Sequence, residues 1–371
     1  MNQRKILVAL SDLSAGGAER VATTLCNSWS AKGYLVTLVV TFSGATEPFY
    51  PLSPEVETIF LAHRVKSQRK SLWNQFERLR ALRWVIQEKQ ADVVISFLTN
   101  VNVAAIFATR GLAVPVIACE RNDPTHQSIP SGLACQRRML YPFAEMITVQ
   151  TEAAAPVMRS ICPSARNIQV IPNPLPSGIP DAAPSREPET KNEYRLIAMG
   201  RFVEQKNFCM LIEEFANLAD ENTNWQLIVY GEGPLRPQLE ERIVRLQMDD
   251  RIHLPGRTAT PWQVMQEADA FVLSSRYEGF PNVLMEAMAL GLPCVAVDCP
   301  HGPRDLSRDG QDALLVPLND SRAFQEALRR IMSDPTLRTE LGRQAQKSIH
   351  HRYNLEKILQ KWEGLFQVLS I

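Results

Sequence analysis

Two glutamates frame a short stretch whose residue types suit a phosphorylated ligand. Seven residues separate Glu278 from Glu286 in "YEGFPNVLMEAMALGLPCVA". Glycine and proline predict a loop up to residue 281, and the apolar run after it predicts a helix that ends at Gly291. Either Glu278 is an ordinary loop acid and Glu286 faces solvent, or the two carboxylates meet different parts of one ligand.

The second interpretation gives each part of the stretch its own chemical task. The amides of Phe280, Asn282 and Val283 lie near the predicted helix N-terminus, where N–H groups and the helix dipole favour a phosphate. Glu286, about one turn into the helix, can accept hydrogen bonds from a ribose diol. Glu278, on the preceding loop, can reach the hydroxyls of a sugar beyond the phosphates.

A second stretch, "MGRFVEQKNF", places two cations just after a predicted strand. Arg201 as a planar fork and Lys206 as a point charge can converge on one diphosphate. Charge-assisted hydrogen bonds of about 1.5 to 3 kcal/mol each are strong enough to hold a leaving group. A solvated loop with two unrelated cations is the alternative.

Glycine turns follow several other predicted strands. Gly16 and Gly17 in "SAGGAERV" lie between a strand and a helix, either as a tight turn or as a place where an anion approaches the backbone. Gly231 in "GEGPLRPQL" and Gly256 with Arg257 in "LPGR" mark later strand ends. Backbone groups there can read a flat base edge, although structural turns explain each glycine equally well.

All of these motifs follow short β-branched segments that alternate with longer helix-compatible stretches. The predicted strands of the first half occupy residues 5–10, 35–42, 91–98, 114–120 and 144–151. Those of the second half occupy residues 194–200, 225–231, 251–256, 268–275, 293–298 and 313–318. The alternation predicts an α/β fold with two Rossmann-like doubly wound domains built on parallel sheets.

A proline-rich segment separates the two sets of strands. Residues 171–193 contain six prolines, which cannot continue a helix or a central strand. We predict an N-terminal domain over 1–175, a linker over 176–193 and a C-terminal domain over 194–353; the final helix can pack on either. Ligands of such sheets bind at the carboxyl ends of the strands, so the cleft between the domains is the expected site.

Composition excludes several other classes of protein. The chain has 371 residues, of which 45% are hydrophobic and 22% charged, as in a globular protein of two domains. It shows neither a signal peptide nor a run of about 18 apolar residues, which predicts a cytoplasmic location. Seven scattered cysteines without a C-x-x-C pair predict reduced thiols, and no D-x-D pair or His/Cys cluster suggests a metal site.

Taken together, the motifs resemble those of a known enzyme family. The stretch "EGFPNVLMEAMALGLPCVA", with "GRFVEQKN" upstream, "GGAERV" near the start and "HGPRDL" downstream, is similar to the retaining glycosyltransferases of family 4. Members of this family have the GT-B fold of two Rossmann-like domains, and the likeness runs from the glycine pair to the last helix. It implies transfer of a sugar from a nucleotide sugar with retention of configuration, which gives an α-linkage.

The resemblance implies how the diphosphate of this donor would be held. Arg201 and Lys206 would neutralise it, assisted by the amides after Gly279 and by the turn at Gly16 and Gly17. Cations aimed at the leaving diphosphate stabilise the charge that develops there, so neither a metal nor another cofactor is implied.

The remaining donor contacts are implied in the same way. Glu286 would hold the ribose and Glu278 the transferred sugar, while the loops around Gly231 and around Gly256 and Arg257 would border the base. The last helix, near 354–371, would cross back onto the N-terminal domain. UDP is the favoured nucleotide and GDP the next.

The chain departs from the family after the predicted fourth strand. Many relatives carry a histidine there, often after a glutamate, whereas here Glu120 precedes Arg121 and Asn122. These three residues are candidates for contact with the acceptor, and a structural salt bridge is the alternative. His301, before "GPRDL", is either a loop residue near the cleft or a base.

A basic segment is the best indication of the acceptor. Residues 62–90 carry eight basic against two acidic residues. A predicted apolar stripe runs through Leu72, Phe76, Leu79 and Ile86, with Trp73 at its edge. The cations around this stripe are Arg69, Lys70, Arg80 and Arg83. Either the helix packs on the core with a solvated rim, or it meets anionic lipid headgroups or a diphosphate-linked lipid acceptor, at about 1 kcal/mol per cation.

The second interpretation predicts a peripheral enzyme on the cytoplasmic face of a membrane, building a lipid-linked glycan or another cell-surface glycan precursor. No nucleic-acid partner is expected. Two alternatives share the sheet architecture. A sugar-nucleotide epimerase with the GT-B fold would convert a nucleotide sugar without an acceptor. A dinucleotide-dependent oxidoreductase is less favoured, because G-x-G-x-x-G and an acid after the second strand are missing.

Overall fold

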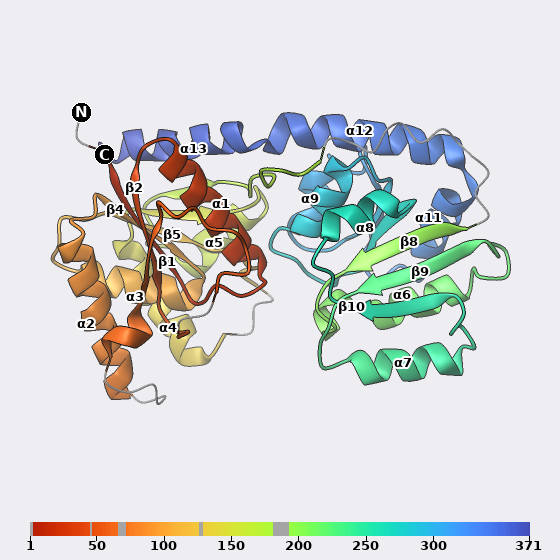
Figure 1. The fold of residues 1–371 in the computed structure, drawn as a ribbon, viewed down its shortest axis with the longest axis horizontal. Coiled ribbons are helices and arrows are strands. Elements are labelled where there is room, and N and C mark those ends of the chain that lie inside the picture. Colours follow the sequence, from red (N-terminus) through yellow and green to blue (C-terminus); the bar gives the residue numbers. More distant parts are fainter. Residues whose placement is uncertain (1–2, 45–46, 66–71, 126–128, 181–192) are drawn as a thin grey trace. The chain divides into compact units, whose positions relative to one another are not determined.

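The chain forms two compact units, each built on its own parallel sheet (Figure 1). The computed structural model describes residues 3–44, 47–65, 72–125, 129–180 and 193–371. Unit 1 combines Met1–Pro176 with Leu355–Ile371, and unit 2 is Ser177–Asn354. Most of the predicted linker, residues 181–192, lies outside the described residues. The predicted α/β fold with two Rossmann-like sheets is confirmed.

Unit 1 contains a seven-stranded sheet in the order β3-β2-β1-β4-β5-β6-β7. Its strands are β1 (Lys5–Leu10), β2 (Leu35–Val40), β3 (Glu57–Phe60), β4 (Val93–Phe97), β5 (Val116–Cys119), β6 (Met146–Val149) and β7 (Ile168–Val170). The central strands β1 and β4 are almost fully buried, because helices cover both faces of the sheet.

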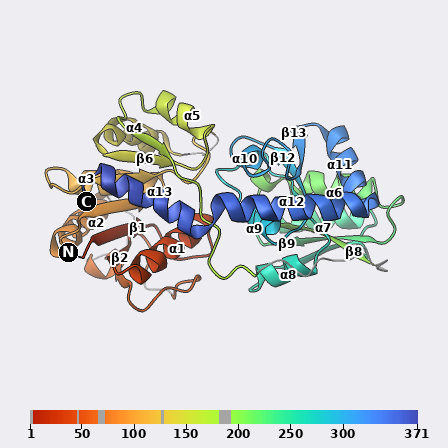
Figure 2. The ribbon, with the colours of Figure 1, turned by 90° about the horizontal axis from the view of Figure 1, so that it is seen from above.

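The helices of unit 1 form two layers. They are α1 (Gly17–Ala31), α2 (Leu72–Glu88), α3 (Thr99–Thr109), α4 (Ser131–Leu140), α5 (Ala154–Ile161) and α13 (Leu355–Val368), with the 3₁₀ turns η1 (Leu61–Arg64) and η2 (Tyr141–Phe143). Helices α1 and α13 share one core with one face of the sheet, and lie side by side in Figure 2. Helices α2, α3 and α5 pack in a second core.

The C-terminal helix α13 is held in unit 1 by large aromatic side chains. Trp362 packs edge-on against Trp29 of α1, with ring centroids 5.6 Å apart, and Phe366 lies 5.8 Å from the same ring. Both tryptophans are fully buried. Such aromatic pairs add about 0.5 to 1.5 kcal/mol beyond the area they bury.

Unit 2 contains a six-stranded sheet in the order β10-β9-β8-β11-β12-β13. Its strands are β8 (Tyr194–Met199), β9 (Trp225–Tyr230), β10 (Ile252–Gly256), β11 (Ala270–Leu273), β12 (Cys294–Asp298) and β13 (Leu314–Pro317). Every pair of neighbouring strands is parallel, so all the strand ends where the motifs lie meet at one edge of the sheet.

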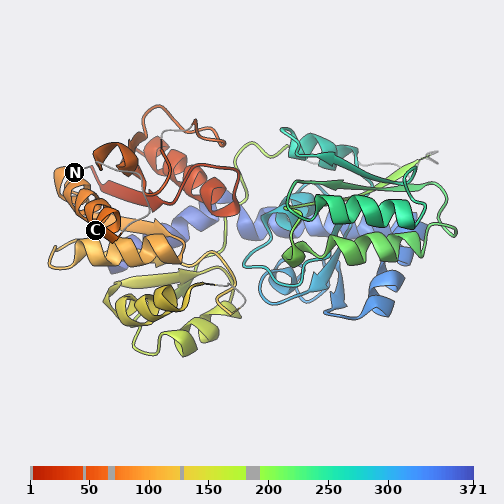
Figure 3. The same ribbon diagram turned by 90° about the horizontal axis from the view of Figure 1, so that it is seen from below.

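Helices again cover both faces of the sheet in unit 2. They are α6 (Phe208–Ala216), α7 (Arg236–Arg245), α8 (Pro261–Glu267), α9 (Asn282–Ala289), α10 (Pro303–Leu306), α11 (Ser321–Ser333) and α12 (Pro335–Tyr353), with η3 (Glu204–Lys206). Helices α6, α7 and α11 share the main core, and Figure 3 shows α6 beside α7. Helices α8 and α9 lie on the face opposite α7 (Figure 1).

The predicted apolar stripe of the basic helix is only partly buried. Helix α2 covers Leu72–Glu88, but Phe76 is 46% and Trp73 70% exposed. The buried side chains near its C-terminal end are Leu82, Val85 and Ile86. Of the stripe residues whose burial the structure describes, Ile86 is fully buried, Leu79 is half-buried and Phe76 faces outward, while the polar Asn74 is buried in the first part of the helix.

Candidate active site

Three glycines at neighbouring strand ends of unit 2 bring the backbone turns into contact. Gly200 donates its N–H to the carbonyl of Tyr230 at 3.0 Å, and Gly231 donates to the carbonyl of Gly256 at 2.9 Å. A Cβ atom on Gly231 would overlap the carbonyl oxygen of Gly200. Gly256 has a φ of +91°, which side chains rarely adopt. Close packing of the turns therefore requires glycine at 231, and the backbone conformation favours it at 256, whatever else these turns contact.

Lys206 and Glu278 form an ion pair at this edge of the sheet. The Lys206 Nζ lies 2.6 Å from Glu278 Oε1, and the two side chains are 15% and 7% exposed. Lys206 ends η3, and Glu278 lies on the loop between β11 and α9. The structure thus joins two residues for which the family resemblance implies separate contacts, one with the diphosphate and one with the sugar.

Backbone contacts between two loops hold this pair in place. The Ser274 hydroxyl donates to the carbonyl of Lys206 at 2.7 Å, and the Gln205 side-chain amide donates to the carbonyl of Tyr277 at 2.9 Å. The N–H of Glu278 donates to the carbonyl of Pro300 at 3.2 Å. The first two bonds fix the two loops to each other and the third fixes the Glu278 loop to the loop after β12, so both side chains are positioned before any ligand arrives.

The ion pair leaves both groups able to bind a ligand. A lysine ammonium has three donors, so Lys206 can hold Glu278 and a phosphate oxygen together. The second carboxylate oxygen of Glu278 can accept from a hydroxyl. Arg201, two residues after β8, is exposed. The arrangement can therefore hold an anion and a polyol next to each other.

Glu286 lies within α9 and is completely buried. Its Oε2 accepts a hydrogen bond from the Trp262 indole N–H at 2.9 Å, which brings α8 and α9 together. The expectation that Glu286 faces solvent if it has no ligand is wrong. A buried carboxylate requires hydrogen-bond donors, and Trp262 supplies one.

Tyr353, the last residue of α12, packs against the loop before α9. Phe280 is 6% exposed, and its ring lies 5.6 Å from that of Tyr353. Helix α9 begins at Asn282, as predicted, and ends before Gly291, which has a φ of +77°. The first N–H groups of a helix, here those of Asn282 and Val283, have no acceptor within the helix itself and suit an anion.

Two further predicted residues of unit 2 differ in exposure. Arg257, after Gly256, is exposed. His301 is 9% exposed with a φ of +62°, at the turn before α10. Its left-handed backbone marks a tight turn, which fits the interpretation of His301 as a loop residue, and its role as a base stays a prediction.

In unit 1, Gly16 and Gly17 lie at the predicted strand-to-helix turn. Helix α1 begins at Gly17, and Gly16 precedes it with extended backbone. A Cβ atom on Gly16 would overlap the carboxylate of Glu19, which is 7% exposed. Gly16 therefore has a packing reason to be glycine, and its contact with an anion stays a prediction.

Glu120 is buried among hydroxyl groups. It accepts hydrogen bonds from the Thr99 hydroxyl at 3.1 Å to each of its oxygens and from the Tyr141 hydroxyl. Burial raises the pKa of Glu120, although these hydrogen bonds and the charge of Arg137 oppose the shift. The same burial, with the nearby Glu120 charge, raises the pKa of Tyr141 well above its usual value. The carboxyl is held rigidly and takes up a proton readily.

Arg121 makes its contacts apart from Glu120. It donates to the Asn173 side-chain oxygen at 2.9 Å and to the Ile171 carbonyl at 3.2 Å. Its guanidinium also lies over the rings of Phe97 and Trp362, and burial lowers its pKa. In the part of the chain that the structure describes, Arg121 and Glu120 form no salt bridge with each other. Asn122, the third acceptor-side candidate, is exposed.

The basic helix is described only in part. Arg69 and Lys70 lie outside the described residues. Arg80 is exposed, and its guanidinium lies 5.9 Å from the ring of Phe76. Arg83 donates to the carbonyls of Ala108 and Arg110, so this cation belongs to the packing of unit 1 and not to its rim.

Within the described ranges, no group of three His, Cys, Asp or Glu side chains is arranged to hold a metal ion. None of the described helices combines the length and apolarity needed to cross a membrane. All seven cysteines are unpaired.

Sequence patterns did not reveal three partners of the candidate residues. Trp262 holds Glu286, and Thr99 and Tyr141 hold Glu120. Each lies on a different element from its partner. The one available signal is that Trp262 opens a short helix soon after Gly256 and Arg257, in a loop that the motifs already mark.

The structure resembles solved proteins of one fold class along almost its entire length. Sucrose-phosphate synthase from Thermosynechococcus elongatus aligns with a TM-score of 0.85 and 18% identity, covering 99% of each chain. HepE from Anabaena, solved with UDP and glucose, aligns with a TM-score of 0.83 and 18% identity, covering 98% of this chain and 100% of its own. Two Rossmann-like units of this kind define the GT-B class of fold.

Family models match the two units separately. One for "Glycosyl transferase 4-like domain" matches residues 16–174, and one for "Glycosyl transferases group 1" matches residues 181–348. The chain belongs to the group 1 glycosyl transferases, and it is a glycosyltransferase. A relative in Campylobacter jejuni, named GalNAc-alpha-(1->4)-GalNAc-alpha-(1->3)-diNAcBac-PP-undecaprenol alpha-1,4-N-acetyl-D-galactosaminyltransferase, is 28% identical over 96% of this chain and 97% of its own.

Proposed function

We propose that this glycosyltransferase moves a sugar from a UDP-sugar to a polyprenyl-diphosphate-linked saccharide, with retention of configuration and without a metal ion. The observation that carries the proposal is the ion pair of Lys206 and Glu278. A largely buried cation and a buried carboxylate lie together at the carboxyl ends of parallel strands, where ligands bind in sheets of this kind, and this supports the proposal. GDP is the alternative nucleotide.

The donor follows from the groups gathered in unit 2. Lys206 and Arg201 would face the diphosphate, together with the N–H groups at the start of α9. Glu278 would accept from hydroxyls of the transferred sugar, and Glu286, steadied by Trp262, from the ribose. The turns at Gly231, Gly256 and Arg257 would border the base. The complex of HepE with UDP and glucose supports the choice of uridine.

In the proposed reaction, the bond between the anomeric carbon and the diphosphate oxygen breaks, and the electron pair stays on the diphosphate. The acceptor hydroxyl bonds to the same carbon from the same face, and its proton passes to the leaving diphosphate oxygen. Negative charge grows on the leaving group as the bond breaks. Lys206 and Arg201 stabilise that charge, which is how fixed cations lower a barrier.

The acceptor is proposed from the Campylobacter relative and from the surface of unit 1. The name of that relative specifies a saccharide linked through PP to undecaprenol. An acceptor with a long apolar tail stays in a membrane, so the enzyme must reach the bilayer surface. Glu120, Arg121 and Asn122 remain the candidates for contact with the saccharide.

Unit 1 has an exposed face suited to that surface. Trp73 and Trp84 of α2 are 70% and 52% exposed, and the Arg64 guanidinium lies 4.3 Å from the Trp84 ring. Phe143 is 50% exposed beneath Arg110, at 3.9 Å. Paired aromatic rings and cations are the residues favoured at the boundary of headgroups and acyl chains. We propose peripheral binding to an anionic membrane through this face.

The experiment combines a donor panel with defined acceptors. Purified protein is incubated with UDP- and GDP-sugars and with short polyprenyl-diphosphate saccharides, with and without EDTA. We expect product from one UDP-sugar, an α-anomeric coupling in its proton NMR spectrum, and equal rates in EDTA. A β-linked product would refute retention, and loss of activity in EDTA would refute metal independence.

The same incubations distinguish the alternatives. Conversion of the donor sugar in the absence of any acceptor would identify an epimerase instead. Bound flavin or nicotinamide in the absorbance spectrum of the purified protein would identify an oxidoreductase.

A further inference from the structure

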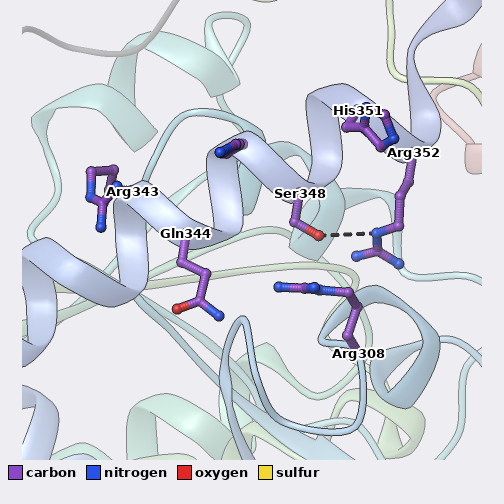
Figure 4. A pocket seen from close by; sticks show the side chains of 7 residues that line it. Arg308, Arg343, Gln344, Ser348, His351 and Arg352 are labelled. Carbon is purple, nitrogen blue, oxygen red and sulfur yellow. Dashed lines mark hydrogen bonds between the residues drawn. The ribbon is translucent and has the colours of Figure 1, made fainter.

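Unit 2 carries a basic cavity that contains none of the residues assigned to the donor. Its volume is about 410 Å³, and it lies between α12 and the turn after α10 (Figure 4). Its lining residues are Arg308, Arg343, Gln344, Lys347, Ser348, His351 and Arg352. Arginine, lysine and histidine make up most of this lining, and no acid belongs to it.

One buried acid lies behind the lining. Asp312, whose side chain is fully buried, accepts hydrogen bonds from Arg308 at 2.5 and 2.6 Å, and the Arg352 guanidinium lies 3.5 Å away. Burial alone would raise the pKa of Asp312, but hydrogen bonds from Arg308 and Ser348 and the two arginine charges hold it below its usual value. Asp312 therefore stays ionised and anchors both arginines, yet it balances only one of their two charges.

Arg352 is fixed by several further contacts. Its guanidinium donates to the carbonyls of Asp305 and Leu306 at 2.7 and 2.6 Å, and its Nε donates to the Ser348 hydroxyl at 3.0 Å (Figure 4). The floor of the cavity is thus rigid, and α12 is tied there to the end of α10.

Arg343 and Lys347 add charge that the described part of the protein does not balance. Both are exposed, and neither forms an ion pair with an acid among the described residues. They are four residues apart on α12, so they lie on one face of the helix. Two like charges at this spacing destabilise a helix by about 0.2 to 0.5 kcal/mol. A bound anion would remove that cost.

We propose that this cavity binds a small phosphate-bearing molecule at a site separate from the donor. Arg343 and Lys347 contact its phosphate oxygens above the rigid floor made by Arg308 and Arg352, and the Gln344 side-chain amide supplies a further donor. Arginine forks match phosphate oxygens in pairs. The cavity is large enough for a diphosphate or a sugar phosphate and not only for a single inorganic ion.

The surroundings of the cavity favour a dissolved phosphate over a lipid headgroup. The large apolar side chains exposed in the described part of unit 2 are Val244 and Leu318, and neither lines the cavity. A headgroup site at a bilayer needs apolar side chains beside it that enter the membrane, as on unit 1. The occupant is therefore a soluble phosphate compound.

The test measures pyrophosphate binding by calorimetry at fixed ionic strength. Because the donor site also attracts phosphates, the background is the full chain carrying Arg201→Ala and Lys206→Ala. We expect this background to bind one pyrophosphate per chain, and addition of Arg343→Gln and Lys347→Gln to weaken it by about tenfold or more. The matched control adds Arg245→Gln and Arg322→Gln, exposed cations outside the cavity, and should leave the affinity unchanged.

Equal pyrophosphate affinity in the background and in the cavity variant would overturn the proposal. A second arm sediments the same proteins with vesicles that contain phosphatidic acid. We expect the cavity variant to sediment as the control does. If the cavity variant loses vesicle binding but keeps its pyrophosphate affinity, the occupant is a lipid headgroup and the proposal of a soluble ligand is wrong. Circular dichroism melts confirm that each variant is folded.

Discussion

The ion pair of Lys206 and Glu278 joins two loops that are 72 residues apart in the sequence. The two side chains lie at a sheet edge, at 15% and 7% exposure, where water screens charges weakly. A cation so placed acts more strongly on a developing negative charge than one on the surface. We therefore expect turnover to be most sensitive to single changes at this pair.

We expect Lys206→Ala to lower kcat about a hundredfold, or about 3 kcal/mol, with a smaller change in the KM for the donor. The charge that Lys206 provides matters most when the leaving diphosphate becomes more negative. Steady-state kinetics with the preferred nucleotide sugar measure both constants. Lys89→Ala, which removes a lysine from the exposed pair with Glu57, is the matched control and should leave kcat unchanged. Equal kcat values in both variants would show that Lys206 is not catalytic.

For Glu286→Ala, the expected result is a higher KM for the donor with little change in kcat. The ribose is present in both ground and transition state, so its contacts contribute to binding uniformly. Loss of a charge-assisted hydrogen bond corresponds to about tenfold to a hundredfold in KM.

Trp262→Phe serves as its control, because it removes the indole N–H and keeps the carboxylate. It should raise KM less than Glu286→Ala does. A KM for Glu286→Ala equal to that of the unchanged protein would remove the ribose contact from the proposal.

Glu120 makes the stability of the folded protein depend on pH. Its pKa is raised in the folded protein by burial, whereas in the unfolded chain it is about 4.3. Between the two values the folded state binds the proton more tightly, so this stabilising contribution is complete below the unfolded pKa and is lost as pH rises. Glu120→Gln does not titrate and escapes that loss.

We therefore expect the Tm of Glu120→Gln, relative to the unchanged protein, to increase as pH rises from about 4 to 7. The free-energy cost of replacing an acceptor oxygen by an amide group does not depend on pH. It therefore changes the Tm difference by the same amount at every pH. Differential scanning calorimetry across this range measures the slope. A difference in Tm that stays constant with pH would contradict the raised pKa.

At the scale of elements, the glycine turns of unit 2 determine how closely the strand ends approach. Gly231 lies against the carbonyl of Gly200, and Gly233 would place a Cβ 2.5 Å from the carbonyl of Phe202. Because the turns after β8 and β9 touch without side chains between them, the loop with Arg201 is held in one position. Packing of the turns alone is thus a sufficient reason for glycine at positions 231 and 233.

The expected effect of Gly231→Ala is a loss of about 1 to 3 kcal/mol of stability, as for an overpacked core, together with a higher KM for the donor. Urea unfolding and steady-state kinetics measure the two effects. Gly364→Ala is the control, since it lies within α13 with open space around its Cβ and should stabilise by about 0.5 to 1 kcal/mol. A urea midpoint for Gly231→Ala at or above that of the unchanged protein would contradict the packing argument.

The periodicity of the sequence predicted the buried central strands well and the short edge strands of unit 1 poorly. β-branched runs marked strands such as β1 and β11 within one or two residues. The edge strands β3 and β7 were not predicted, because they are short and only partly buried. For helix α2 the sequence left open whether the apolar stripe packs on the core or meets a membrane, and in the structure Ile86 is buried whereas Phe76 is exposed.

For the candidate site, the sequence predicted positions within single stretches but not contacts between stretches. Spacing within one stretch placed Glu278 and Glu286 on a loop and a helix, as observed. Contacts between stretches, such as Lys206 with Glu278 or Glu286 with Trp262, depend on tertiary packing and leave no local pattern. The sequence thus identified candidate residues, and the structure showed which of them are in contact.

At the scale of the whole molecule, the two units differ in what they expose. Residues 1–185 carry 18 Lys and Arg against 13 Asp and Glu, a balance of +5, which leaves −5 for the rest of the neutral chain. Exposed aromatic side chains also gather on unit 1, where Trp73, Phe76, Trp84, Phe107 and Phe143 lie on or near the neighbouring helices α2 and α3 or on η2. Positive charge and apolar rings on one unit favour its attraction to an anionic bilayer.

We expect the double variant Trp73→Ser and Phe76→Ser to lose most of its binding to vesicles that contain anionic lipid. Each ring buries apolar area in the interface, so at about 25 cal/mol per Å² the pair outweighs one surface charge.

Arg80→Glu should weaken binding less, and its effect should fade at high salt because exposed charges are screened. The matched control is Phe49→Ser, a 57% exposed ring on the segment between β2 and β3 and not on α2 or α3, which should sediment as the unchanged protein does. If the double variant also sediments unchanged while turnover with a water-soluble acceptor stays normal, the α2 face does not contact the membrane. The proposed lipid-linked acceptor would then have to be reached by another route.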